Sequence, residues 1–192
     1  MGNPPELSEL RFVALGELSR DQLDRLVAEV SRRVAAPCRV VPTPDASELH
    51  GRLLDGRPQL DGRPQLDGDH LLGALEGVAE GPGLVVGVTG RDLGRKIFRF
   101  VFGLARSGGP ALLVSTARLD PALYGLPADP ALSARRASAE VLHELGHAFG
   151  AGHCPRADCI MHFAPEVESI DLRGMRFCGS CARDLPEELV SR

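Results

Sequence analysis

Short apolar runs and one helical pattern alternate over the first 120 residues of the chain. The runs predict β-strands at residues 10–15, 40–41, 84–89, 97–103 and 111–115. After the first run, apolar residues recur with helical spacing from about Arg20 to Val34, and Ser19 with Gln22 matches a capping box. This order of elements predicts an α+β fold built on a twisted, mixed β-sheet with helices.

A second helix is predicted after residue 129. Asp129 and Pro130 suit the N-cap and the first helical position. Seven apolar residues then follow with helical period: Ala134, Ala137, Val141, Leu142, Leu145, Ala148 and Phe149. Four polar residues fall on roughly the opposite side: Arg136, Glu140, His143 and His147. Taken alone, this pattern indicates an amphipathic helix with a solvated polar face.

Two residues on this polar side belong to the pattern H-E-x-x-H-x-x-G-x-x-H. It is present as H-E-L-G-H-A-F-G-A-G-H at residues 143–153. His143 and His147 are four residues apart, so they lie on one face, one turn apart, and can bind one metal ion. Gly150 suits the helix end because glycine adopts positive φ at low cost, and the chain can then return His153 as a third ligand. Three protein ligands and one open position are typical of catalytic zinc.

Glu144 completes the chemistry of this motif. It lies roughly 100° around the helix from His143, where it can reach a water on the metal without binding the metal itself. The full motif therefore predicts a zinc peptidase with Glu144 as the general base. For a bare H-E-x-x-H, a solvated polar face without a metal is a serious alternative. The added Gly150 and His153 leave little weight for that alternative.

Five further residues extend the pattern toward the C-terminus: Cys154, Cys159, Met161, Cys178 and Cys181. With them, the chain resembles the archaemetzincins, a family of metzincin-clan zinc metallopeptidases. The resemblance is tight over residues 143–181 and looser over 85–93, 100–105 and 113–119. Sixteen residues separate Met161 from Cys178, one fewer than is usual in the family, and the difference falls in a loop.

The resemblance implies a metzincin-like zincin fold with two zinc ions per chain. The first ion is catalytic and lies at the three histidines. The second is structural and is held by four thiolates, from Cys154, Cys159, Cys178 and Cys181. A C-x-x-C pair and clustered cysteines independently suit tetrahedral zinc. Two disulfides or four reduced thiols are the alternatives, and disulfides are rare in the reducing compartment expected for this chain.

Met161 resembles the methionine of the metzincin Met-turn, a soft apolar floor under the zinc-binding imidazoles and not a ligand. A gap-filling core methionine is the plainer interpretation. Phe163 stands where some metzincins have a tyrosine near the metal, so that oxygen is absent here. We expect His162 to face solvent or a loop, and Cys38 to be a small buried hydrophobe.

We expect one catalytic domain over residues 1–192. Its N-terminal subdomain, 1–152, would hold the sheet and the zinc-binding active-site helix, and a small C-terminal subdomain, 153–192, would hold the Met-turn and the structural zinc. Residues 55–66 repeat D-G-R-P-Q-L twice, which predicts a surface loop over 55–69 and not a solenoid. His50 and His70 flank the loop without a ligand pattern, as ordinary surface histidines.

Composition is that of a small globular enzyme, with 43% hydrophobic and 25% charged residues. The net charge of −4 and the lack of a long basic run argue against nucleic acid as a partner. No apolar run approaches a membrane span, and the first residues lack the pattern of a signal peptide. We therefore expect a cytoplasmic protein, without membrane contact, that acts as a monomer.

The expected partner is a peptide or protein substrate, and the family resemblance adds aminopeptidase action on short peptides. The substrate is expected to lie extended along an exposed sheet edge, for which the strand over Phe98–Phe102 is the candidate. Two other functions stay open. One is a zinc hydrolase of a non-peptide amide, and the other is a latent or non-peptidase zinc-binding protein.

Overall fold

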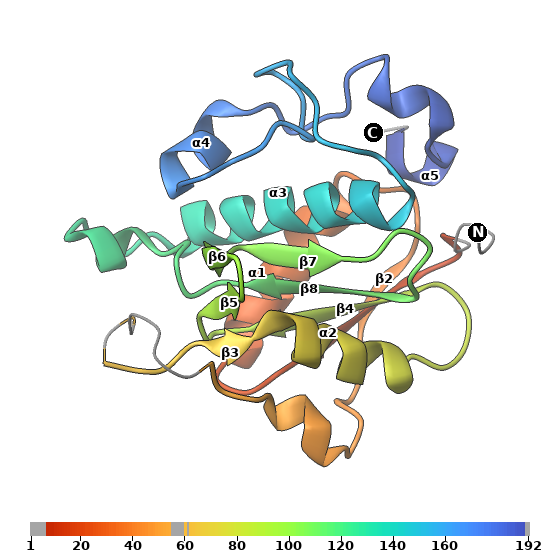
Figure 1. Ribbon diagram of the computed structural model, residues 1–192. Helices are drawn as coiled ribbons and strands as arrows, with labels where there is room; N and C mark the ends of the chain where they lie inside the picture. The colour runs from red at the N-terminus through yellow and green to blue at the C-terminus, as the bar shows by residue number, and fades with distance from the viewer. Residues whose placement is uncertain (1–6, 55–59, 61, 191–192) are drawn as a thin grey trace.

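The protein is described by a computed structural model covering residues 7–54, 60 and 62–190. Its centre is a five-stranded sheet in the order β2-β1-β4-β8-β7 (Figure 1). The bounds are β1 (Leu10–Ala14), β2 (Cys38–Val40), β4 (Leu84–Thr89), β8 (Ala111–Ser115) and β7 (Gly103–Ala105). The first four strands are parallel, and β7 runs antiparallel to β8 at one edge. The predicted mixed sheet is confirmed.

Helices cover both faces of this sheet. The helices α1 (Arg20–Ser31) and α3 (Pro130–Ala148) pack on one face, and α2 (Gly68–Gly77) packs on the other. Alternate residues of a strand point to opposite faces, so neighbours in one strand enter different cores. Phe12 belongs to the core under α1 and α3, whereas Val13 belongs to the core under α2. The capping box of Ser19 and Gln22 is present at the start of α1.

A second, three-stranded sheet lies beside the first, in the order β3-β5-β6. It consists of β3 (Leu66–Asp67), β5 (Leu93–Arg95) and β6 (Phe98–Val101). The prediction of one strand over 97–103 is therefore wrong, because the chain bends at Phe102 and passes from β6 in the small sheet to β7 in the large one. β6 forms one edge of the small sheet and β7 forms one edge of the large sheet, so the placement of a substrate along Phe98–Phe102 stays a prediction.

The loop predicted over 55–69 lies partly outside the described residues, at 55–59 and 61. Its last part is not loop, because Leu66–Asp67 forms β3 and α2 begins at Gly68. The two histidines that flank it, His50 and His70, are both exposed, as expected. Cys38 is half-buried, so it is less enclosed than predicted, although it does pack against the core under α1.

The C-terminal residues lie across α3, on the side away from the sheet (Figure 1). They contain α4 (Val167–Leu172) and α5 (Glu187–Val190), with the 3-10 helix η3 (Cys181–Asp184) between them. Two further 3-10 helices, η1 (Ser47–His50) and η2 (Pro121–Tyr124), lie earlier in the chain. Ile160, Met161 and Val167 join the same core as the sheet and α3. As a result α3 is enclosed on nearly all sides, and Arg136, Glu140 and His143 are buried. No helix in the described part of the chain has the length and apolarity to cross a membrane.

Both ends of α3 follow from its sequence. At the start, the Asp129 carboxylate accepts hydrogen bonds from the backbone N–H groups of Ala131 and Leu132, at 3.0 and 2.9 Å. At the other end, the N–H of Ala151 donates to the carbonyl of Gly146, and that of Gly150 donates to the carbonyl of His147. This is a Schellman motif, and it requires the positive φ of 90° that Gly150 adopts.

Replacing Gly150 with alanine should lower the free energy of unfolding by about 1–2 kcal/mol, because a Cβ disfavours this left-handed conformation. Gly77→Ala is the matched control. Gly77 ends α2 with open space around its Cα and no positive φ, so alanine there should be neutral or stabilise by about 0.5–1 kcal/mol. Urea unfolding of the metal-free protein measures both, and equal effects would contradict this account of the helix end.

Candidate metal centre

Three imidazoles converge at the C-terminal end of α3. His143 and His147 lie one turn apart on the helix, and His153 returns to them after the reversal at Gly150. One ring nitrogen from each of the three lies within 4.8 Å of the others. The Nε2 atoms of His143 and His147 are 3.1 Å apart. The structure thus brings together the three histidines of the motif.

Backbone carbonyls fix the orientation of two of these rings. The Nδ1 atom of His143 is 2.8 Å from the carbonyl oxygen of Ile160, and Nδ1 of His147 is 2.8 Å from that of Ala151. A carbonyl can only accept, so each Nδ1 carries the proton and each Nε2 presents a lone pair toward the other imidazoles. Metal-binding histidines are commonly held in this way by their second nitrogen. The donor set fits zinc.

Burial also favours the neutral rings that a metal needs. Removal from water lowers the pKa of His143 to about 3, with the nearby Arg173 charge as a further cause. Burial likewise lowers the pKa of His147 and of His153. At neutral pH the three rings are therefore uncharged without any metal, and their lone pairs are available for binding.

Glu144 is buried beside the histidines, against the edge strand β7. Burial raises the pKa of its carboxyl group well above the ordinary value, and the charge of Glu140 acts in the same direction. A Cβ on Gly103 of β7 would lie only 2.6 Å from Cγ of Glu144. Glycine at position 103 therefore provides the space that the Glu144 side chain occupies.

Met161 lies directly under the helical turn that joins the two histidines. It is fully buried, and a Cβ on Gly146 would lie 2.3 Å from its sulfur atom. The glycine within H-E-L-G-H thus allows the methionine to approach the helix backbone. Next to it, His162 is half-buried, with its Nδ1 atom 3.0 Å from the carbonyl oxygen of Cys154. The ring of Phe163 is half-exposed and contacts the ring of His153, with centroids 5.1 Å apart.

A buried ion pair that the sequence did not predict lies next to His143. Arg173, in the segment after α4, donates to the carboxylate of Glu140 on α3, and both side chains are almost fully enclosed. Its second terminal nitrogen, Nη1, lies 3.3 Å from the carbonyl oxygen of His162 and 3.2 Å from Nδ1 of His143. Burial raises the pKa of Glu140, and the Arg173 charge opposes that shift.

Of the two residues in this pair, only Glu140 has a position that the sequence indicates. Glu140 precedes His143 by three residues, a spacing that places two side chains on one helix face. Nothing in the local sequence marks Arg173 as its partner, thirty-three residues away. The neighbouring pair of Arg136 with Asp171 repeats the arrangement one turn earlier. Together the two pairs tie α3 to α4 and the residues that follow it.

The histidines and Glu144 line a cleft of about 540 Å³. One wall is formed by residues 98–105, which include β6 and β7. The opposite wall is formed by Phe163, Ala164 and Pro165. Among the described strands, β7 pairs only with β8, so its other edge is open to a further strand. Three candidate metal ligands, a carboxylate and an unpaired strand edge therefore meet in one cavity.

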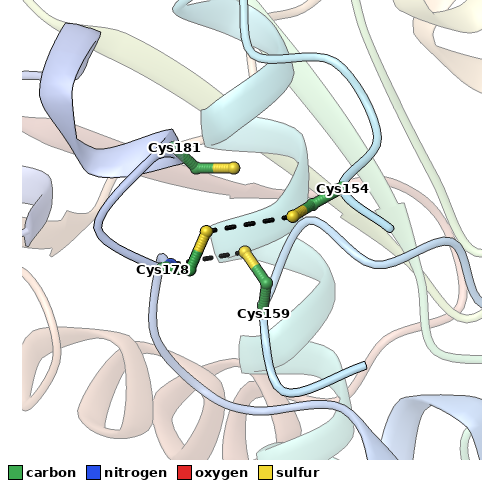
Figure 2. A group of neighbouring side chains, drawn as sticks. All are labelled: Cys154, Cys159, Cys178 and Cys181. Carbon is green, nitrogen blue, oxygen red and sulfur yellow. Dashed lines mark hydrogen bonds between the residues drawn. The ribbon is translucent and has the colours of Figure 1, made fainter. Parts of the chain in front are cut away.

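Four cysteines form a second cluster, shown in Figure 2. The sulfur atoms of Cys154, Cys159, Cys178 and Cys181 lie within 4.8 Å of one another. All four are free thiols, and the Cys154 and Cys178 sulfurs are 3.8 Å apart, beyond the length of a disulfide bond. Backbone N–H donation, first from Cys181, lowers the pKa of Cys178 to about 6. Burial raises the pKa of Cys159 and of Cys181, so these two thiols ionise less readily. The four sulfur donors match the number that tetrahedral zinc takes.

Comparison with known proteins gives one consistent result. A sequence model of peptidase family M54 matches residues 81–187. The archaemetzincin of Pyrococcus horikoshii is 43% identical over 105 residues, which are 55% of this chain and 56% of that protein. The archaemetzincin of Methanopyrus kandleri is 40% identical over 62% of this chain and 65% of its own length. The matched segment thus spans just over half of the length of the Pyrococcus relative.

Solved structures are similar over most of the chain. The archaemetzincin structure from Methanopyrus kandleri has a TM-score of 0.67 and 31% identity, covering 91% of each chain. The archaemetzincin from Archaeoglobus fulgidus, solved in complex with malonate, has a TM-score of 0.71 and 26% identity, covering 92% of this chain and 99% of that one. A zinc-dependent peptidase from Methanocorpusculum labreanum, 24% identical, has a TM-score of 0.75. These likenesses confirm the predicted fold.

The contact between Gly146 and Met161 can be tested by a double-mutant cycle. Gly146→Ala should lower the free energy of unfolding by about 1–3 kcal/mol, because the added methyl group overlaps the methionine sulfur. Met161→Ala removes that overlap, so the alanine at 146 should cost clearly less in the double variant. Denaturant unfolding measures all four proteins. Purely additive effects would show that the two residues do not interact.

Proposed function

The chain belongs to peptidase family M54, and we propose on this basis that it is a zinc-dependent peptidase with Glu144 as its general base. One observation carries the proposal. The ring nitrogens of His143, His147 and His153 converge in a cleft, with the Glu144 carboxylate and an open strand edge beside them. Each part of this arrangement has a role in hydrolysing a peptide bond.

Zinc held by the three histidines would activate a water molecule and polarise the scissile carbonyl group. Glu144 would accept a proton from that water as its oxygen attacks the carbonyl carbon, and would then deliver the proton to the nitrogen of the leaving amine. The buried position of Glu144 supports this role. Burial raises its pKa, while a bound cation would lower it, and these opposed effects suit a carboxyl group that takes a proton and then releases it.

The open edge of β7 supports an extended peptide as the substrate. A peptide that paired with β7 as a further strand would pass Gly103, next to the Glu144 side chain. Main-chain hydrogen bonds would then hold the scissile bond in register with the catalytic groups. Aminopeptidase action on short peptides is the more specific form of the proposal, and internal cleavage is its competitor.

We further propose that the four cysteines hold a second, structural zinc ion, giving two ions per chain. The C-terminal subdomain, residues 153–192, would depend on this ion. Free thiols in such a site are stable in a reducing compartment, which favours the cytoplasm. Both ligand sets come entirely from one chain, so a monomer would be complete.

The first experiment is hydrolysis of a diverse peptide library by the zinc-loaded protein, read by mass spectrometry. Glu144→Ala should lower the rate at least about 10²-fold, because the other carboxylate among the described lining residues, Glu140, is paired with Arg173. Glu187→Ala, which removes an exposed carboxylate in α5, is the matched control and should retain full activity. The positions of the cuts distinguish end trimming from internal cleavage. Activity that survives Glu144→Ala would exclude this mechanism, and zinc-bound protein that cuts no peptide would exclude the peptidase function.

The second zinc is tested by Cys178→Ser. The bound zinc should fall from two ions to one, and the free energy of unfolding should fall by more than about 2 kcal/mol, because metal binding contributes folding energy. Cys38→Ser is the matched control, since Cys38 is half-buried in β2 and lies outside the cluster. Metal analysis and thermal unfolding give the two readouts. A Cys178→Ser protein with unchanged zinc content and stability would refute the second site.

A further inference from the structure

We infer that the hairpin β5–β6 selects substrates with an acidic residue, flanked by apolar residues, next to the scissile bond. The inference rests on the proposed peptidase function and adds the class of substrate. The hairpin reads R-K-I-F-R over residues 95–99, the densest group of cations beside the cleft. It contrasts with the chain as a whole, whose net charge is −4.

The hairpin stands at the cleft and presents both charge and apolar surface. Arg95, Phe98 and Arg99 line the cavity that contains the histidines and Glu144. Ile97, in the turn, is 84% exposed, and Phe98 is 41% exposed. Ile97 and Phe98 are adjacent, so they form a small exposed apolar surface beside the cavity, which Phe98 lines. A peptide in the cleft is the partner that their position supports.

The two arginines of the hairpin that line the cavity differ in their partners. Arg99 is exposed and forms no ion pair with any residue that the structure describes. Arg95 in β5 lies opposite Phe98 in β6 and packs over its ring. Arg95 also forms an ion pair with Asp69, at 2.9 Å. Asp69 does not line the cavity. The Arg95 charge is close enough to Glu144 to oppose the burial-driven rise of its pKa.

The cleft offers few carboxylates to a positively charged substrate residue. The only carboxylates among its described lining residues are Glu140 and Glu144. Glu140 is already paired with the buried Arg173, and Glu144 is assigned to proton transfer. A lysine or an arginine side chain near the hairpin would therefore meet the charge of Arg99, which no described carboxylate pairs with. Apolar walls around these cations strengthen their attraction for a carboxylate.

Matched peptides test this inference. In a neutral, apolar ten-residue peptide, a single Glu is moved along the sequence, and each peptide is compared with its Gln counterpart. At low salt the wild-type protein, loaded with zinc, should cleave the best Glu peptide about 3- to 10-fold more efficiently, as kcat/KM, than the Gln peptide. In 0.5 M salt the ratio should approach one, because exposed charges are screened.

Arg99→Gln tests the inference more cleanly than Arg95→Gln, because the charge of Arg95 also lowers the pKa of Glu144. It should reduce the Glu-to-Gln ratio of kcat/KM, and Arg95→Gln combined with it should remove most of the preference. Arg135→Gln deletes an equal charge from the exposed side of α3, outside the cleft, and should leave the ratio unchanged. A wild-type protein without acidic preference would overturn the inference, as would a preference that survives the double variant.

Binding separates failure of this inference from failure of the proposed function. Fluorescently labelled Glu and Gln peptides are titrated with zinc-loaded Glu144→Gln protein, and anisotropy gives the dissociation constants. Tighter binding of the Glu peptide, lost in Arg99→Gln, would support the hairpin even if no peptide were hydrolysed. Equal binding of both peptides, together with hydrolysis of both, would leave a peptidase without this specificity.

Discussion

The candidate site depends on the reversal of the chain at Gly150. An α-helix can place two histidines on one face, but its next turn would carry a third ligand out of reach of a tetrahedral ion. The Schellman motif at the end of α3 solves this by turning the chain back within three residues. The carbonyl of Ala151, released from the helix by this turn, then orients the ring of His147. One glycine conformation therefore provides the third ligand and aligns the second.

The rest of the fold holds this helix end in place. The sheet and α1 support one side of α3, and the C-terminal residues close the other side through Ile160, Met161 and the buried pair of Arg173 with Glu140. Burial lowers the pKa of the imidazoles, that of His143 to about 3, and raises the pKa of Glu144. The same enclosure that stabilises the protein thus prepares the side chains for a metal and for proton transfer.

Local sequence predicted those parts of the fold that local physics decides. The strands over 84–89 and 111–115 are continuous apolar runs, and the ends of α3 are set by Asp129 and Gly150, so all of these could be read directly. The helix α2 was missed because its ten residues contain three glycines, and β5 because it has only three residues. The strand over 97–103 was divided by tertiary pairing, since β6 pairs with β5 and β7 with β8. The partnership of Glu140 with Arg173 is a long-range contact without a periodic signal.

The two metal-binding clusters share a short piece of backbone. His153 and Cys154 are consecutive, one in each cluster. Further along, Cys159 belongs to the thiol cluster, the carbonyl of Ile160 orients His143, and Met161 lies under the helix. A displacement of the thiols is therefore transmitted through one or two peptide units to the imidazoles. Oxidation of the cysteines, which lie outside the cleft, would thus disturb the alignment of the histidines.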